Sequence, residues 1–133
     1  ADPSGLNANN TSSAYDMAQL IAYAAADERI GAVMRKTSYA TSSGKVKISA
    51  NSTNQLVKVG DLDVLGGKTG FISRSGYCLA SLLRLPQTGQ QVAVVVLGAK
   101  SNASRFWETR HLFNWLSSRT SALVTSGDAQ HDE

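Results

Sequence analysis

A lysine and a threonine stand next to each other in Lys68-Thr69-Gly70, directly after a pair of glycines. The lysine ammonium supplies a point charge and the threonine hydroxyl a short hydrogen-bond donor, so together they can hold an anion such as a carboxylate. Gly70 has no side chain, which leaves room for a ligand that lies along the strand edge as an added strand. The three residues predict a carboxylate site; the alternative for so short a motif is a plain turn that enters a strand.

The same residues imitate the end of a phosphate-binding loop, Gly-Lys-Thr at positions 67–69. Such a loop has a glycine five residues before its Gly-Lys pair, where this chain has Leu62, and it opens a helix whose amides meet the phosphates. Here a strand is predicted to follow Gly70. The sequence therefore argues against a nucleotide site.

Other reactive side chains lack partners at useful spacing. His111 and His131 have no Asp, Glu, His or Cys at ligand spacing, so we expect no metal site and no cofactor. The single cysteine, Cys78, excludes an internal disulfide and a multi-cysteine zinc site, and it is expected to be a small core residue. Asp61 and Asp63 are expected to be solvated loop residues rather than an acid–base pair.

The first elements that position these residues are predicted to be helices. Apolar residues recur at helical spacing over residues 14–25, behind Ser12 or Ser13 as a cap. A second short helix is expected to begin at Asp27 or Glu28. We therefore expect two consecutive helices ahead of the strands.

Separate strand-like segments follow, the last of which ends at residue 98. Residues 37–49 predict a polar hairpin at an edge or on the surface, and residues 51–54 a loop. Residues 71–85 and 90–98 predict an antiparallel hairpin joined by the turn at 86–89. Because both faces of residues 90–98 are apolar, this segment is expected to be a central strand covered on both sides.

A last helix is predicted from Ser101 or Ser104 to about Ser117. The chain is then divided into a folded part, residues 1–118, and a polar, acidic tail, residues 119–133, that is expected to be disordered. The predicted fold class is α/β, of the α+β type, with an antiparallel sheet flanked by helices. A sheet covered on both faces needs more helix than this chain offers, so we expect further chain to belong with it.

The composition is that of a globular domain. Of the 133 residues, 42% are hydrophobic and 17% charged, which excludes a disordered or collagen-like chain. The longest apolar runs, residues 20–26 and 92–99, are too short to span a bilayer. The first residues do not have the pattern of a secretory leader, so we expect such a signal to be either absent or already removed. The net charge of +3 is spread along the sequence, so no nucleic-acid partner is expected.

Several segments together resemble the serine D-alanyl-D-alanine carboxypeptidases and endopeptidases, low-molecular-weight penicillin-binding proteins related to class A β-lactamases. The segments that match, in family order, are DPSGL at residues 2–6, NTSSAYDMAQL at 10–20, NSTNQL at 51–56, GKTGF at 67–71, SGYCL at 75–79, and the last strand and helix at 94–99, 104–106 and 112–115. The resemblance covers about residues 2–116 and implies a β-lactamase/transpeptidase-like fold that is incomplete here.

The family's chemistry needs three motifs that converge in one cleft, S-x-x-K, S-x-N and K-T-G. Its serine attacks the carbonyl of the penultimate D-Ala and forms an acyl-enzyme, with the lysine one helical turn on as the base. The resemblance implies that Lys68 and Thr69 bind the terminal carboxylate of a peptidoglycan stem peptide that ends in D-Ala-D-Ala. It also implies that Gly70 gives clearance and that the Phe71 backbone amide donates to the oxyanion hole.

The nucleophile and its base are not expected in these 133 residues. Ser42-Ser43-Gly44-Lys45 has the S-x-x-K spacing, but that pair needs a helix and Ser43-Gly44 predicts a turn. Ser49-Ala50-Asn51 and Ser52-Thr53-Asn54 match S-x-N as chance allows in a serine-rich stretch. In the family both serine motifs precede the DPSGL segment, so the resemblance places them in a missing N-terminal part, within one longer chain or as a separate chain.

The resemblance implies a hydrolase of the bacterial periplasm or cell envelope that acts on the cell wall and is acylated by β-lactams. Residues 1–118 are then the C-terminal part of its catalytic domain, and this chain alone is expected to be inactive. Carboxypeptidase and endopeptidase activity both stay open. A different class of function stays open as well, a non-catalytic module in which Lys68 and Thr69 capture a peptide carboxylate.

Overall fold

The computed structural model describes residues 2–128, with side chains up to residue 123, and it has a mixed α/β fold. The elements in chain order are α1 (Ala14–Ala26), α2 (Glu28–Met34), β1 (Ser38–Ser43), β2 (Val46–Asn51), α3 (Gln55–Val59), β3 (Val64–Ile72), β4 (Gly76–Arg84), β5 (Gln91–Ala99) and α4 (Asn102–Asp128). The strands form a two-stranded sheet, β1-β2, and a three-stranded sheet, β3-β4-β5, and every pairing is antiparallel. The predicted fold class is confirmed.

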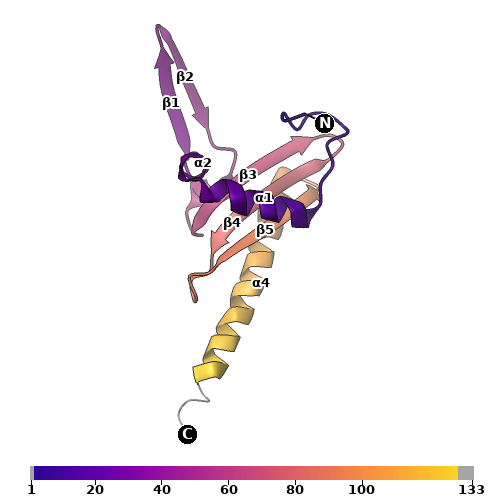
Figure 1. Ribbon diagram of the computed structural model, residues 1–133, viewed down its shortest axis with the longest axis vertical. Coiled ribbons are helices and arrows are strands. Elements are labelled where there is room, and N and C mark those ends of the chain that lie inside the picture. Colours follow the sequence, from indigo (N-terminus) through magenta and orange to yellow (C-terminus); the bar gives the residue numbers. More distant parts are fainter. Residues whose placement is uncertain (1, 129–133) are drawn as a thin grey trace.

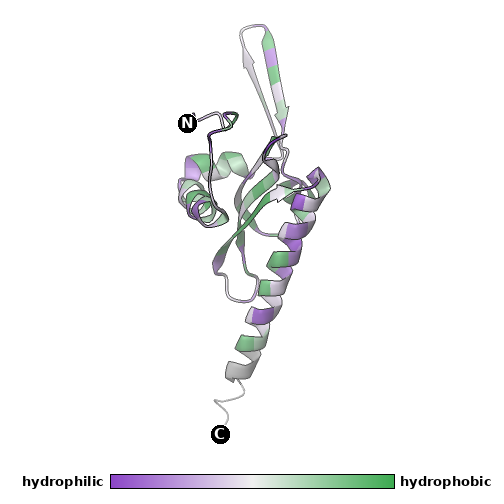
Figure 2. Ribbon diagram, turned by 90° about the vertical axis from the view of Figure 1, so that its right-hand side faces the viewer, coloured by the Kyte–Doolittle hydropathy of each residue, from purple (hydrophilic) through white to green (hydrophobic). Residues whose placement is uncertain are grey.

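The three-stranded sheet lies between two helices (Figures 1 and 2). Helix α1 packs on all three strands and α4 packs on β4 and β5, so α1 covers one face and α4 the other. The core between the sheet and α4 is built from buried apolar side chains of the strands, α3 and α4; its members include Leu56, Leu79, Leu83, Val94, Phe106 and Phe113. Burial of this apolar surface is the main stabilising contribution to the sheet.

The helix starts follow the capping chemistry in the sequence. Ser13 caps α1 by accepting a hydrogen bond from the Asp16 amide, and Asp27 caps α2 by accepting one from the Arg29 amide. Both predicted helices are confirmed. Helix α3 was not predicted, because its single turn, which follows the predicted loop at residues 51–54, is too short to show a period. It buries Leu56 completely.

Helix α4 is longer than predicted, because it continues to Asp128 instead of ending near Ser117. Residues 119–128 are therefore helical, and residues 129–133 lie outside the described part of the chain. The division of the chain at residue 118 stays a prediction. Within residues 2–128, none of the helices combines the length and apolar character needed to cross a bilayer.

The strand predicted over residues 71–85 was wrong in its bounds, because β3 and β4 are two strands joined by a turn at residues 73–75. Ser75 closes this turn by donating its amide to the Ile72 carbonyl, 3.1 Å away, and Gly76 follows with φ of +69°. Ser and Gly are turn residues. As a consequence, Lys68-Thr69-Gly70 lies within β3 rather than ahead of a strand.

Strand β5 was predicted to be central, and that was wrong: β4 is the middle strand and β5 is an edge strand. The prediction that both its faces are covered is confirmed, because α1 and α4 both pack against it. Apolar residues on both faces of a strand indicate that both faces are packed against other elements. They do not indicate whether another strand pairs with each of its two hydrogen-bonding edges. In the part of the chain described, the outer edge of β5 has no strand beside it.

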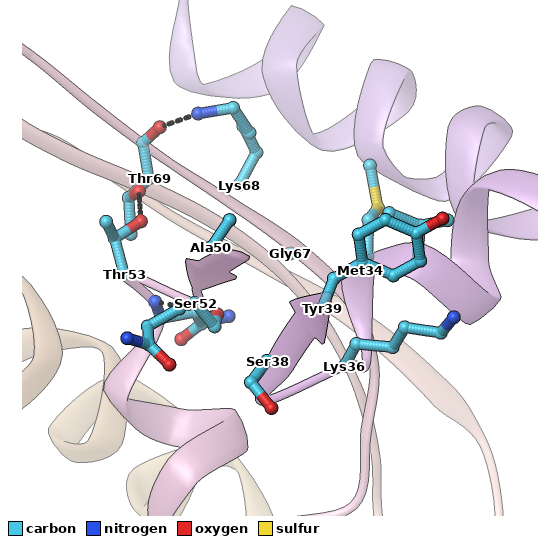
Figure 3. Close-up of a pocket in the computed structure, with 13 residues that line it drawn as sticks. Met34, Lys36, Ser38, Tyr39, Ala50, Ser52, Thr53, Gly67, Lys68 and Thr69 are labelled. Carbon is cyan, nitrogen blue, oxygen red and sulfur yellow. Dashed lines mark hydrogen bonds between the residues drawn. The ribbon is translucent and has the colours of Figure 1, made fainter. Parts of the chain in front are cut away.

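The hairpin β1–β2 projects from the body as an arm (Figures 1 and 2). All of its strand residues are exposed, as expected for a surface hairpin, and Gly44 turns the chain with φ of +59°. Its base lies beside β3 at the position of the predicted carboxylate site (Figure 3).

Candidate active site

Among residues 2–128, β3 is an edge strand of its sheet, and it carries the predicted site residues. Lys68 and Thr69 are successive strand residues, so their side chains leave on opposite faces: Lys68 is exposed and Thr69 is buried. The long Lys68 side chain folds back and donates from Nζ to the Thr69 carbonyl oxygen (Figure 3). Both residues therefore line the same hollows in the surface.

Thr69 is held by a residue to which sequence reasoning gave no role. Its hydroxyl oxygen lies 2.5 Å from that of Thr53, which comes just before α3 (Figure 3). Asn54 then caps α3 by accepting from the Leu56 amide, so the start of that helix sets the position of Thr53. The signal available in the sequence was the NSTNQL segment, which carries Thr53 and Asn54.

Gly70 and Phe71 follow on the same strand. A Cβ on Gly70 would come no nearer than 3.8 Å to another heavy atom, the Cβ of Cys78, so the space above this residue is open. The Phe71 ring is exposed and stacks on Tyr77 of β4, with 4.2 Å between ring centroids. The strand therefore stays uncovered on the side where a ligand backbone could approach.

Arg105 of α4 lies under this part of the sheet and is only 6% exposed. Its Nη1 donates to the carbonyl oxygens of Gly70, at 3.1 Å, and Cys78, at 3.2 Å, and its Nη2 donates to Asn102. The register of β4 and β5 shifts between Tyr77 and Leu79, which frees the Cys78 carbonyl for this contact. Burial lowers the pKa of the Arg105 guanidinium, which remains charged at neutral pH.

Sequence reasoning missed the role of Arg105. The residue stood next to Phe106 in a helix, and nothing local showed that its guanidinium reaches Gly70, 35 residues earlier. The usable signal was a charged side chain within the apolar stripe of α4, since a buried charge needs partners.

Two hollows flank Lys68 and Thr69. The first, of about 300 Å³, lies between Gly67–Thr69, the end of α2 and the base of the β1–β2 hairpin (Figure 3). The second, of about 1040 Å³, lies at the other end of β3 and is lined by the segment before α1, by Gly70–Ile72 and by Arg105. The edge of β3 therefore joins the two hollows, so an extended ligand that lies along β3 could reach both of them.

The serine motifs within the chain do not form a catalytic pair. Ser42 and Ser43 lie in β1 on the exposed arm, and Gly44 turns the chain before Lys45, so the predicted turn is confirmed. Ser49-Ala50-Asn51 lies at the end of β2. Lys68-Thr69-Gly70 lies within a strand, whereas a phosphate-binding loop would be followed by a helix.

The remaining candidates have structural contacts. Asp61 and Asp63 are not merely solvated, as expected, because they pair with arginines: Asp61 accepts from Arg110 and Asp63 from Arg84, the latter at 3.0 Å. The hydrogen bond from Arg110 is the main reason that the pKa of Asp61 is lowered. His111 stacks on Trp107, and Cys78 is half-buried in β4.

The comparison with protein families decides the relationship. The family model for D-alanyl-D-alanine carboxypeptidase matches residues 1–101. This range includes strand β3, which lines both hollows, and the β1–β2 hairpin. The chain belongs to this family. Arg105 lies just beyond the range of this family model, and its contact with the Gly70 carbonyl comes from the structure.

Two curated proteins are similar to this chain, and each is named a D-alanyl-D-alanine endopeptidase. The protein from Haemophilus influenzae is 31% identical over 104 residues, which are 78% of this chain and 36% of that protein. The protein from Escherichia coli is 27% identical over 117 residues, which are 86% of this chain and 37% of that protein. The chain thus spans little more than a third of the length of these relatives.

Gly67 in this family member has a packing role that can be tested. A Cβ at this position would come within 2.7 Å of Asn54 Nδ2 and 3.4 Å of the Ala80 carbonyl oxygen. We expect Gly67→Ala to lower the free energy of unfolding by about 1–3 kcal/mol, because β3 must move away from the cap of α3. Urea unfolding of the complete protein measures this change.

Gly70→Ala is the matched control, because it adds the same methyl group on the same strand where the nearest atom is 3.8 Å away. We expect it to change the free energy of unfolding by less than about 0.5 kcal/mol. Equal losses for both variants would show that the contact between Gly67 and Asn54 is not tight.

Proposed function

We propose that the complete protein is a serine-type D-Ala-D-Ala peptidase of the bacterial cell envelope that acts on peptidoglycan stem peptides. In this proposal the present chain supplies the half of the site that binds the substrate carboxylate. The observation that carries it is the arrangement of Lys68 and Thr69, which line the same hollows at the open edge of β3. Family membership supports the reaction class.

The substrate is proposed to lie along β3 as an added strand. Lys68 has one hydrogen bond, to the Thr69 carbonyl, so two of its three ammonium donors remain for a carboxylate. The Thr69 hydroxyl is hydrogen-bonded to that of Thr53, and Thr69 lines the same hollows as Lys68. The terminal carboxylate of the stem peptide binds here, and Gly70 lets the peptide backbone approach.

The reaction then proceeds through an acyl-enzyme. A serine supplied by an N-terminal part of the protein attacks the carbonyl carbon of the penultimate D-Ala, and the Phe71 amide donates to the developing oxyanion. The C–N bond breaks, the leaving amine takes a proton, and water later hydrolyses the ester to a carboxylate and free serine. β-Lactams are proposed to acylate the same serine.

Labelling with a fluorescent penicillin tests the proposal. The complete protein is expected to become covalently labelled, and an acyl-D-Ala-D-Ala peptide is expected to slow the labelling by competition. Residues 1–133 alone are expected to stay unlabelled, because the nucleophile lies outside them. Covalent labelling of this chain at Ser42 would overturn the assignment of the nucleophile to the N-terminal part.

The alternative, a non-catalytic carboxylate-binding module, gives a different result in the same experiment. It predicts saturable, reversible binding of the acyl-D-Ala-D-Ala peptide that is lost in Lys68→Ala, with no covalent label on the complete protein. The same Lys68 and Thr69 contacts would serve both functions, so the covalent label discriminates between them.

A further inference from the structure

The β1–β2 arm carries exposed apolar side chains on one of its two faces. Successive residues of a strand point to opposite faces, so Val46 and Ile48 share one face of the arm and Lys47, between them, lies on the other. Val46 is 61% exposed and Ile48 is 52% exposed. Figure 2 shows hydrophobic and hydrophilic residues in alternation along one strand of the arm. In the part of the chain described, nothing covers these two apolar side chains.

The tip of the arm, residues 43–48, is also positively charged. Lys45 lies in the turn beside Gly44, and both Lys45 and Lys47 are exposed. Within residues 2–128, neither lysine forms an ion pair. The sequence has no acidic residue from position 29 to position 60, whereas its basic residues there are Arg29, Arg35, Lys36, Lys45, Lys47 and Lys58. The positive charge at the tip therefore calls for a partner that is negatively charged.

The arm stands clear of the rest of the molecule (Figures 1 and 2). Each of its strands has six residues, and all of them are exposed. At about 3.3 Å per residue, six residues extend about 20 Å. A tip held in this way can touch a broad surface while the three-stranded sheet and its helices stay away from that surface.

A lipid surface fits this tip better than a protein surface does. Protein interfaces are depleted of lysine, and a stable one buries about 800 Å² on each partner, which is more than the tip of one hairpin offers. A second copy of the arm would place lysines against lysines, which is unfavourable. At a bilayer surface, by contrast, apolar side chains enter the boundary between headgroups and acyl chains while lysine ammoniums reach the phosphates.

We propose that the tip of the arm docks on the surface of a bilayer that contains anionic lipids. Val46 and Ile48 enter the interfacial layer, and Lys45 and Lys47 contact the headgroup phosphates. The outer hydrogen-bonding edges of β1 and β2 stay at the depth of the headgroups, where water satisfies them. Because only two apolar side chains enter the layer, the docking is weak and reversible. This inference goes beyond the proposed function and does not depend on it.

Co-sedimentation of the complete protein with lipid vesicles tests the inference. The vesicles are made of equimolar phosphatidylglycerol and phosphatidylcholine, or of phosphatidylcholine alone. Wild type is expected to bind the anionic vesicles, less tightly as salt is raised, and to bind the neutral vesicles much more weakly. The double variant Lys45→Gln/Lys47→Gln is expected to lower the partition coefficient on anionic vesicles about thirtyfold. Val46→Ser/Ile48→Ser is expected to lower it about tenfold, at low and at high salt.

Two matched double variants remove the same kinds of groups away from the arm. Lys58→Gln/Lys100→Gln removes two exposed positive charges, and Tyr23→Ser/Val59→Ser removes two exposed apolar side chains. Both are expected to keep the partition coefficient within threefold of wild type. Urea unfolding of every variant checks that it is folded, and the free energy of unfolding should change little, because all of the substituted residues are exposed.

No binding of wild type to anionic vesicles would overturn the inference, and that result is expected if the arm contacts an acidic protein instead. Arm variants that bind as tightly as wild type would overturn it as well. A dimer that light scattering detects and that the arm substitutions dissociate, with vesicle binding unchanged, would assign the tip to a second copy of the chain. Penicillin labelling is expected to be the same in wild type and arm variants, so the docking and the proposed peptidase function can fail separately.

Discussion

Lys68→Ala is expected to lower kcat/KM of the complete protein for an acyl-D-Ala-D-Ala peptide by about a hundredfold to a thousandfold. The substitution removes the positive charge that faces the substrate carboxylate, and losing one partner of a desolvated, hydrogen-bonded charge pair costs about 2–5 kcal/mol. The same change removes the hydrogen bond to the Thr69 carbonyl, which is a local contact at the surface. Steady-state hydrolysis by wild type and variant measures the effect.

Lys100→Ala serves as the control, because Lys100 is exposed, follows β5 and lines neither hollow. It removes the same charge from the protein, so it reports the effect of net charge on substrate attraction, which should be within twofold. If Lys68→Ala keeps kcat/KM within threefold of wild type, the carboxylate does not bind at Lys68 and the orientation of the substrate on β3 is wrong.

Arg105→Met is expected to lower the free energy of unfolding by about 3 kcal/mol, because two carbonyl oxygens inside the protein lose their donor. These are the carbonyls of Gly70 and Cys78, on adjacent strands. The guanidinium ties β3 to β4 beside the site, so its loss should also lower activity through kcat. Urea unfolding and steady-state kinetics of the complete protein measure the two effects.

Two further substitutions separate geometry from charge. Arg105→Lys keeps the charge, but a single ammonium lacks the planar fork that reaches both carbonyls, so we expect an intermediate loss of stability. Arg110→Met removes an arginine of the same helix that pairs with Asp61 at the surface, and we expect a loss below about 1 kcal/mol. A loss for Arg105→Met no larger than for Arg110→Met would contradict the positioning role of Arg105.

Local chemistry made part of this architecture predictable. Ser13 and Asp27 cap helices whose apolar spacing was visible in the sequence, and Gly44 turns a polar hairpin that is exposed throughout. Each of these features depends on residues within one or two turns of each other, where backbone preference and side-chain hydrogen bonding act directly. The turn at residues 73–75 was missed because the apolar sequence on both sides outweighed it.

The sequence by itself determined the chemical types at the candidate site: an ammonium, a hydroxyl and a residue without a side chain in Lys68-Thr69-Gly70. Only the tertiary structure decided which groups surround them. Thr53 bonds Thr69 from 16 residues away and Arg105 bonds the Gly70 carbonyl from 35 residues away. Contacts at such separations depend on strand register and helix packing, and neither leaves a period in the local sequence.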